Sequence, residues 1–208
     1  VLDNDLIAHV VLQENNAIAV VDLVTKEITE IRPLGTIDHS LYGYGLDASN
    51  RTDGINIASF PIKGMFMPNS FDNISVLGTT YLVTANEGDS RDYDGYSEEE
   101  RVADLNLDSL TFLDRDYLQN SHLLGRLKTT TANGDIDGDG DFDEIYSYGT
   151  RSFSIWNETT GELVFDSGDL IEQIIASHPD YAALFNAHNE GGELEMKNRS
   201  DDKGPEPE

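Results

Sequence analysis

The sequence contains no cysteine among its 208 residues. This absence excludes disulfide bonds, thiol nucleophiles, cysteine-ligated zinc and iron–sulfur clusters. It does not indicate a redox compartment. Any structural or catalytic role therefore depends on other residue types.

Positive charge is scarce in this chain. Only 13 Lys and Arg residues oppose 40 Asp and Glu residues, so the formal net charge is -27 at pH 7. Like charge repels phosphate at long range and no basic stripe offsets it, so we expect no binding of nucleic acid. The apolar share of 38% is enough for a core, which favours a globular protein over a disordered one. The acid excess also suits a high-salt habitat, where self-repulsion is screened.

Long apolar runs are missing as well. The longest, at residues 7–12 and 17–21, fall far short of the roughly 20 residues that span a bilayer, so we expect no membrane insertion within this segment. The first residues lack the basic and apolar regions of a secretory signal, and there is no initiating methionine. We therefore expect a processed or trimmed chain.

Short apolar segments separated by turn residues recur along the chain and predict strands. Ser97 and Glu100 form a capping-box pattern, which predicts a short helix over residues 98–105. Two more helices are predicted on either side of His178 and Pro179, at residues 170–177 and 181–186. The predicted strands are at residues 9–12, 17–23, 28–31, 73–77, 80–84, 123–130, 144–148, 153–157 and 162–166. The expected fold class is all-β, with a few short helices in the connections.

Two segments of the chain resemble one another. In residues 15–28 and 151–164, a hydrophobic strand leads into a polar turn with threonine and a charged residue, and a second strand follows. Such repetition is typical of a β-propeller, whose blades have roughly four strands over 40 to 50 residues. We expect blade-like units at about residues 1–35, 65–130 and 140–208, which amount to part of a propeller. The long polar connection from Thr36 to about Asn56 is expected to lie outside the core.

The strongest local motif is a run of five aspartates that ends in a strand. Oxygen ligands at positions 1, 3, 5 and 9, a glycine at position 6 and a backbone carbonyl at position 7 suit Ca²⁺. The side-chain ligands would be Asp135, Asp137, Asp139 and Asp143, and Asp141 would offer its carbonyl. Position 12 is Tyr146 where an EF-hand needs glutamate. The alternative is a solvated acidic turn, which five crowded carboxylates without a cation make unfavourable.

Two further polar clusters carry charged side chains in suggestive patterns. The first contains Glu87, Asp89, Arg91, Asp92 and Asp94, which could hold a metal, orient a phosphate or form a surface ion network. The second contains Lys203, Glu206 and Glu208, within residues 199–208. By composition alone this second segment is predicted to be a disordered tail.

Familiar catalytic motifs are missing. The chain has no G-x-S-x-G turn and no phosphate-binding glycine-rich loop. Its histidines are scattered, and none has the spacing of a metal-ligating pair. These histidines are His9, His39, His122, His178 and His188. The residues give no direct sign of a catalytic centre.

Five strings in this order resemble the choice-of-anchor I family: "LQENNAIAVVDL", "TANEGDSRDYDGYSEEERV", "GDIDGDGDFDEIYSYGTRSFSIW", "VFDSGD" and "RSDDKGPEPE". These are secreted or surface-anchored β-propeller-like proteins related to mesenchyme cell-surface glycoproteins. The resemblance implies that residues 1–208 are an N-terminal portion of one propeller whose remainder is missing. It also implies that Lys203, Glu206 and Glu208 lie in an ordered strand or loop. Some relatives are labelled alkaline phosphatases, which identifies no catalytic group here.

Two functions remain open at this point. The first is a secreted or cell-surface calcium-binding propeller module with a structural, assembly or adhesion role. Its open strand edges would be covered by its own missing blades, by another protein chain or by a homo-oligomer or surface assembly. The second is a metal-dependent phosphatase or phosphodiesterase. Its only candidate site residues are Glu87, Asp89, Arg91, Lys203, Glu206 and Glu208.

Overall fold

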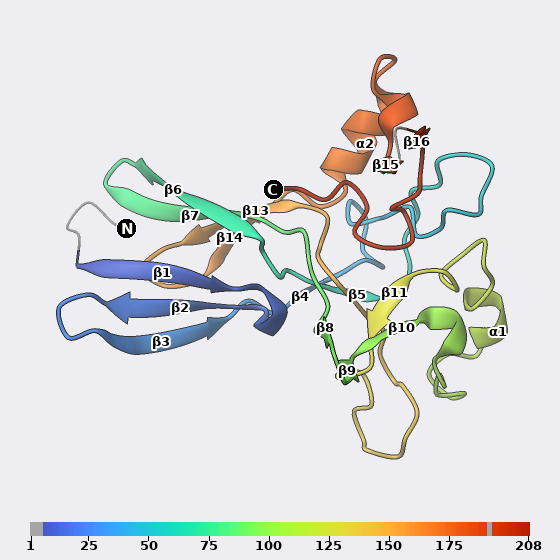
Figure 1. The fold of residues 1–208 in the computed structure, drawn as a ribbon, viewed down its shortest axis with the longest axis horizontal. Helices are drawn as coiled ribbons and strands as arrows, with labels where there is room; N and C mark the ends of the chain where they lie inside the picture. Colours follow the sequence, from blue (N-terminus) through green and yellow to red (C-terminus); the bar gives the residue numbers. More distant parts are fainter. Residues whose placement is uncertain (1–5, 191–192) are drawn as a thin grey trace.

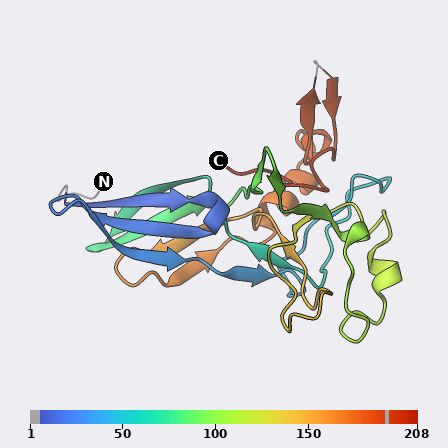
Figure 2. The same ribbon diagram turned by 60° about the horizontal axis from the view of Figure 1, so that its bottom comes forward.

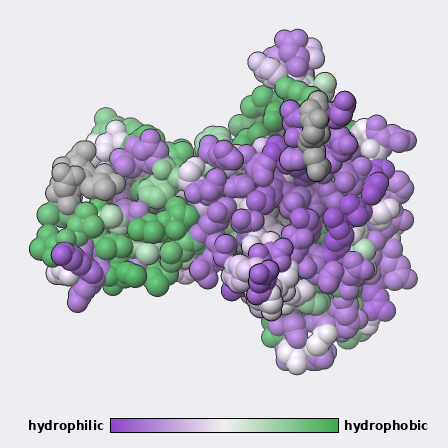
Figure 3. All heavy atoms as spheres, viewed as in Figure 1, coloured by the Kyte–Doolittle hydropathy of each residue, from purple (hydrophilic) through white to green (hydrophobic). Residues whose placement is uncertain are grey.

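The computed structural model describes residues 6–190 and 193–208, and these residues form two lobes side by side (Figure 1). The first lobe holds two sheets of long strands. The second holds short strands, short helices and long connections. The first lobe shows much apolar surface, whereas the second is mostly hydrophilic on the face drawn in Figure 3. The all-β class is confirmed.

The first sheet is an antiparallel meander at the N-terminal end of the described chain. It contains β1 (Ile7–Leu12), β2 (Ala17–Asp22) and β3 (Glu27–Pro33) in that order. The connection from β1 to β2 is a single 3₁₀ turn, η1 (Gln13–Asn15). Asn16 ends this turn in the left-handed conformation, with φ of 50°, which asparagine tolerates better than most residues. The strands predicted here are confirmed.

The second sheet has the order β14-β13-β7-β6 and is antiparallel throughout. Strands β7 and β13 are neighbours in the sheet although residues 86–152 separate them in sequence. The sheet therefore takes two strands from each of the units predicted at residues 65–130 and 140–208. Its strands are β6 (Ser70–Val76), β7 (Thr79–Ala85), β13 (Phe153–Asn157) and β14 (Leu163–Asp166).

The repeat seen in the sequence is also a repeat of backbone pairing. The β2–β3 hairpin and the β13–β14 hairpin have the same strand register and the same bulge, at a constant offset of 135 residues. A bulge at one fixed place re-aims the strand in both hairpins. The equivalent pairs are Val20↔Glu30 and Ile155↔Phe165 before the bulge, and Val21↔Ile28 and Trp156↔Leu163 after it.

The turns of the two hairpins match as well. The Oδ1 atom of Asp22 accepts the amides two and three residues ahead at 2.7 and 2.9 Å, and Oδ1 of Asn157 does the same at 3.0 and 3.0 Å. This side-chain mimic of a turn is what Asp and Asn favour. Four residues after each, Lys26 and Gly161 adopt positive φ of 62° and 72°. The two segments therefore form two hairpins with the same backbone structure.

The two sheets pack face to face. A cluster containing Ile18, Phe66, Leu82 and Trp156 fills the space between them, with Phe66 and Trp156 in edge contact at 4.9 Å between ring centroids. At the periphery, His9 lies 6.5 Å from the ring of Phe71. The apolar cluster holds the two sheets of the first lobe against each other.

The second lobe is built around a mixed five-stranded sheet with the order β10-β11-β12-β5-β4, in which only β12 and β5 run parallel. Its core includes Leu46 and Ala48, so the expectation that residues 36–56 lie outside the core is wrong. Apolar residues at a few positions of that polar segment are enough to bury it. The strands are β4 (Thr36–Asp38), β5 (Lys63–Met65), β10 (Glu99–Arg101), β11 (Lys128–Thr130) and β12 (Tyr146–Ser147). The main core cluster is Leu46, Ala48, Phe60, Ile62, Val102, Leu105, Leu107, Phe112, Leu118, Leu124, Leu127 and Ile145.

The remaining elements are short. Two small hairpins occur, of which β15–β16 projects from the second lobe (Figure 2). None of the described helices has the length and apolar composition that crossing a bilayer requires. The elements are β8 (Asp92–Tyr93), β9 (Tyr96–Ser97), β15 (His188–Glu190), β16 (Glu193–Glu195), α1 (Arg115–Leu118), α2 (Leu170–Ser177), η2 (Val102–Asp104) and η3 (Ala182–Leu184).

Three predicted elements differ from the structure, besides the strand predicted at residues 144–148, which shortens to β12 (Tyr146–Ser147). The helix predicted at residues 98–105 is wrong, because Glu98 is buried against Arg91 and β10 pairs with β11 instead. Of the strand predicted at residues 123–130, only β11 is a strand. The residues before it lie in turns, which place Leu124 and Leu127 in the core of the second lobe. The helix α2 is confirmed, but its predicted successor shortens to η3. Tertiary contacts override local propensity in the first two cases.

The sheets of the described residues are separate and open, and none closes on itself. A complete propeller is therefore not part of this structure. What the first lobe does contain is a three-stranded and a four-stranded antiparallel sheet packed against each other.

Candidate functional site

The aspartate run forms a compact loop held by its own side chains. Asp135 accepts the amides of Gly138 and Gly140 at 2.7 and 3.2 Å, and Asp143 accepts the amide of Ile136 at 2.9 Å. The two glycines adopt φ of 81° and 99°, which residues with a side chain rarely adopt. The turns that these glycines permit bring the start and the end of the loop together.

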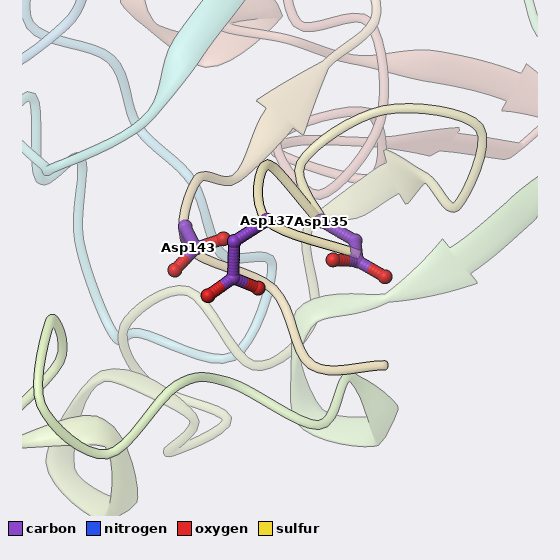
Figure 4. A group of neighbouring side chains, drawn as sticks. All are labelled: Asp135, Asp137 and Asp143. Atoms are coloured by element: carbon purple, nitrogen blue, oxygen red, sulfur yellow. The ribbon is translucent and has the colours of Figure 1, made fainter. Parts of the chain in front are cut away.

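Three of the five aspartates come close enough to share a cation. One carboxylate oxygen from each of Asp135, Asp137 and Asp143 lies within 4.8 Å of the others, and Figure 4 shows Asp137 between the other two. Asp139 and Asp141, which the motif also nominated, lie outside this group. Carboxylate oxygens at this spacing match the ligands that Ca²⁺ takes, although a full shell of six to eight needs further oxygens.

The electrostatics of the loop reflect its crowding. The neighbouring charge of Asp139 is the main cause of a raised pKa at Asp137. The pKa of Asp141 is raised too, first by burial and then by Asp139. Like charges at close range favour the protonated acid, whereas a bound cation would favour the carboxylate. The loop is thus an electrostatically unfavourable arrangement that a divalent cation would relieve.

The base of the loop is fixed to the second lobe. The carbonyl of Gly134 accepts the amides of Asp143 and Glu144 at 2.8 and 3.1 Å, and Phe142 pairs with Leu107 in an isolated parallel bridge. The strand β12 begins two residues after Glu144. The loop is therefore joined directly to the sheet of the second lobe.

The two other charged clusters of the sequence meet in space. Lys203 Nζ lies 3.1 Å from Glu87 Oε1 and 3.2 Å from Asp89 Oδ1. Lys128 lies nearby and pairs with Glu99 at 3.1 Å and Asp202 at 3.0 Å. A cavity of about 370 Å³ is bordered by both lysines and carries more carboxylates than cations. Its charged lining residues are Glu14, Asp89, Asp92, Glu99, Lys128, Asp202 and Lys203.

The other candidates of these clusters have different partners. Arg91 donates through Nε and Nη2 to Glu98 Oε2, and this hydrogen bonding raises the pKa of the guanidinium. Glu206 pairs with Arg199, and the charge of Glu208 also acts on Arg199. Asp92 and Asp94 are exposed on or beside the β8–β9 hairpin. The six proposed catalytic candidates therefore do not converge on one point.

The segment at residues 199–208 is packed against the second lobe, so its composition-based prediction as a disordered tail is wrong. Ser200 and Asp201 are buried. Asp201 Oδ2 accepts from Arg101 at 2.8 Å and from Arg126 at 3.0 Å. The buried carboxylate of Asp201 is retained here because two arginines donate to it.

A buried ion network not foreseen from the sequence anchors this segment. Arg151 donates to Glu172 Oε1 and to the Asp47 carbonyl, each at 2.8 Å, and its second Nη donates to the carbonyls of Ser200 and Asp202 at 2.8 and 2.9 Å. Burial raises the pKa of Glu172, and the charge of Arg151 opposes this shift. These residues are far apart in sequence and form no motif.

The histidines form no metal site among the described residues. His39 is buried, and its Nδ1 lies 2.6 Å from the carbonyl of Tyr44, so Nδ1 carries the proton. Burial lowers the pKa of His39 to about 4. His9 lies 3.3 Å from Glu158, and burial lowers its pKa as well. Each of these two side chains is held by contacts within the fold.

Residues 1–208 match the model of the choice-of-anchor I domain along their whole length. The chain belongs to the choice-of-anchor I family. Among curated proteins it is similar to Gigasin-3a of Magallana gigas, with 38% identity over 92 residues. That alignment covers 43% of this chain and 31% of Gigasin-3a, well under two thirds of the relative. No solved structure matches the chain. Family membership points to an extracellular, surface-anchored module.

Proposed function

We propose that this choice-of-anchor I chain is a secreted or cell-surface calcium-binding module with a structural role in assembly or adhesion. The observation that carries the proposal is the group formed by Asp135, Asp137 and Asp143, together with family membership. The described residues offer no convergent nucleophile and base, which favours a structural over a catalytic role.

Calcium has a clear physical role in this loop. The cation would neutralise crowded carboxylates at the base of β12 and so stabilise the folded state relative to the unfolded one. Binding to the folded state alone adds about 2.7 kcal/mol at a hundredfold excess of free Ca²⁺ over Kd. Mg²⁺ requires a tighter octahedral shell and is expected to substitute poorly.

Calorimetric titration of the 208-residue chain with Ca²⁺ and Mg²⁺, paired with melting curves in calcium and in chelator, tests this proposal. Asp137→Asn should abolish calcium binding and make the melting temperature insensitive to chelator. Asp116→Asn, on the exposed face of α1, removes one charge elsewhere and serves as the matched control. Wild-type protein that binds no calcium and melts identically in chelator would leave the loop as a solvated turn.

The packing of the two sheets supports a blade-like role for them in a larger propeller. The first sheet contributes the face that carries His9 and Ile18, whereas the second contributes the face with Leu82 and Trp156. The equivalent of Ile18 in the second sheet is Phe153, which lies on its outer face. Like units thus pack through unlike faces, and such head-to-tail contacts can continue into a ring.

The meeting of Lys203 with Glu87 and Asp89 favours one alternative, a metal-dependent phosphoric ester hydrolase. Lysine and carboxylates beside a polar cavity are groups that such chemistry uses. Hydrolysis of p-nitrophenyl phosphate and its diester, measured with and without Ca²⁺, tests this alternative. Activity that Lys203→Met abolishes would favour the enzyme, and absence of turnover would favour the structural module.

A further inference from the structure

The internal repeat extends beyond the two hairpins to a third strand. The β1–β2 register matches the β7–β13 register, with β1 and β7 offset by 74 residues and β2 and β13 by 135. Even the hydrogen bond from Leu23 N to the Leu6 carbonyl at 2.8 Å has its equivalent, from Glu158 N to Thr80 at 3.1 Å. The strands β1-β2-β3 and β7-β13-β14 are therefore two copies of one three-stranded unit.

Among the described residues, only one of the two copies has a fourth strand. In the second sheet, β6 pairs with β7 along its full length. At the equivalent edge of β1, no described strand pairs. Val10, whose equivalent in the second sheet is Thr84, is 46% exposed on the face of the first sheet that points away from the second sheet. In the second sheet the residue opposite Thr84 is Phe71, which belongs to the inter-sheet cluster.

The edge of β1 also lacks the usual protection against pairing. Edge strands of soluble proteins commonly carry charges or proline that discourage another strand. The other three edge strands of this lobe follow that rule, since β3 carries Glu27, Glu30 and Arg32, β6 carries Asp72, and β14 carries Asp166. Strand β1 has no Asp, Glu, Lys or Arg, and the lowered pKa of His9 keeps that residue neutral at pH 7. The edge strand β1 is therefore uncharged in a protein that is otherwise strongly acidic.

We propose that the open edge of β1 binds one antiparallel strand, a further segment of the same polypeptide, in the register that β6 has on β7. An apolar residue of this strand lies opposite Val10, as Phe71 lies opposite Thr84. All four strands of the second sheet come from one chain, and a second copy would bring another charge of -27 to the contact. The proposal deepens the blade-like role above and rests on the repeated strand register and the uncharged edge of β1, independently of calcium.

A graft built from the chain's own sequence tests this inference. A copy of residues 70–78, which comprise β6 and its two-residue turn, replaces residues 1–4, because the 74-residue offset places Gly78 at position 4. The control graft carries Asp72→Pro and Asn73→Pro. Alternate residues of a strand donate to a given neighbour, so one of these two faces β1, and proline cannot donate.

The active graft should melt about 2–4 °C above the proline graft or more, which corresponds to a modest gain for a chain of this size. Hydrogen exchange of the β1 amides that β2 leaves unpaired should slow about tenfold or more. Equal melting temperatures and equal exchange, or a lower melting temperature for the active graft, would overturn the proposal. So would a dimer of the ungrafted chain that Val10→Lys dissociates, because the occupant would then be a second copy. Unchanged calcium titration in both grafts keeps this test separate from the proposed function.

Discussion

Arg151 and Glu172 form a buried ion pair, with Nη1 of the arginine 2.8 Å from Oε1 of the glutamate and both side chains at most 4% exposed. Arg151 also has a positive φ of 59°, an uncommon conformation for a residue with a long side chain. Its guanidinium connects the Asp47 carbonyl, the helix α2 and the segment at residues 199–208. Removal of one partner leaves the other charge buried and unpaired.

We therefore expect Arg151→Met to lower the free energy of unfolding by about 3–5 kcal/mol. Urea unfolding measures the change. The matched control is Arg199→Met, whose pair with Glu206 is about one quarter exposed and should contribute under about 1 kcal/mol. The double variant Arg151→Met with Glu172→Leu should recover part of the loss. Equal costs for Arg151→Met and Arg199→Met would contradict the importance of the buried pair.

The buried His39 makes stability depend on pH. Its pKa is about 4 in the folded chain and about 6.5 when unfolded, so the unfolded state binds the proton first as the pH falls. The stabilisation is complete above pH 6.5 and is lost between pH 6.5 and 4. At pH 5 the loss from this group is about 2 kcal/mol.

His39→Asn tests this dependence, because an asparagine amide keeps a donor near the Tyr44 carbonyl but does not titrate. The variant should lose about 2 kcal/mol less than wild type between pH 7 and pH 5, as measured by urea unfolding at both values. Parallel pH profiles for the two proteins would show that His39 does not control this range.

The repeated hairpin gives a paired prediction on backbone conformation. Lys26 has φ of 62° where its equivalent is Gly161, and a left-handed residue with a side chain costs about 1–2 kcal/mol. Lys26→Gly should stabilise the chain by up to about 1 kcal/mol, since glycine's greater freedom in the unfolded state offsets part of the gain. Gly161→Ala should destabilise it, because a Cβ there would also lie 3.2 Å from Arg32 Cδ. Thermal melts of both variants check the signs, and two changes of the same sign would contradict the equivalence.

The charge of -27 predicts a stability that rises with salt. Carboxylates repel one another across the second lobe, and screening shortens the range of that repulsion to about 3 Å at 1 M ionic strength. The melting temperature in chelator should therefore rise between low salt and 1 M NaCl. Chelator removes the separate effect of calcium. A flat response would argue against adaptation to high salt.

The first lobe was predictable from the sequence because its information is local. Apolar alternation and turn residues such as Asn16 and Asp22 act within a few positions, so the hairpins and their repetition could be recognised before the structure. The neighbouring positions of β7 and β13 in the sheet, despite their long separation in sequence, were not predictable in this way. Their pairing depends on contacts between distant segments.

The candidate site likewise has local features that the sequence predicts and long-range features that it does not. Aspartates at alternating positions identified the loop, but which of them converge depends on turns at Gly138 and Gly140, so Asp139 could not be separated from Asp137 in advance. Glu98 shows the opposite error, since a helical pattern gave way to a buried ion pair with Arg91. Arg151 had no local signal at all, because its partners are single residues from distant segments.

Residues 86–152 enter and leave the second sheet through two neighbouring strands, where the first sheet needs only Gln13 to Asn16 to make the same connection. The aspartate loop, the Glu87 cluster and much of the second core all lie within this insertion. The repeated three-stranded unit can accept such an insertion without a change in its strand register, because both ends of the insertion return to adjacent strands. A change within this insertion can therefore alter the aspartate loop and the Glu87 cluster while the strand pairing of the two sheets stays the same.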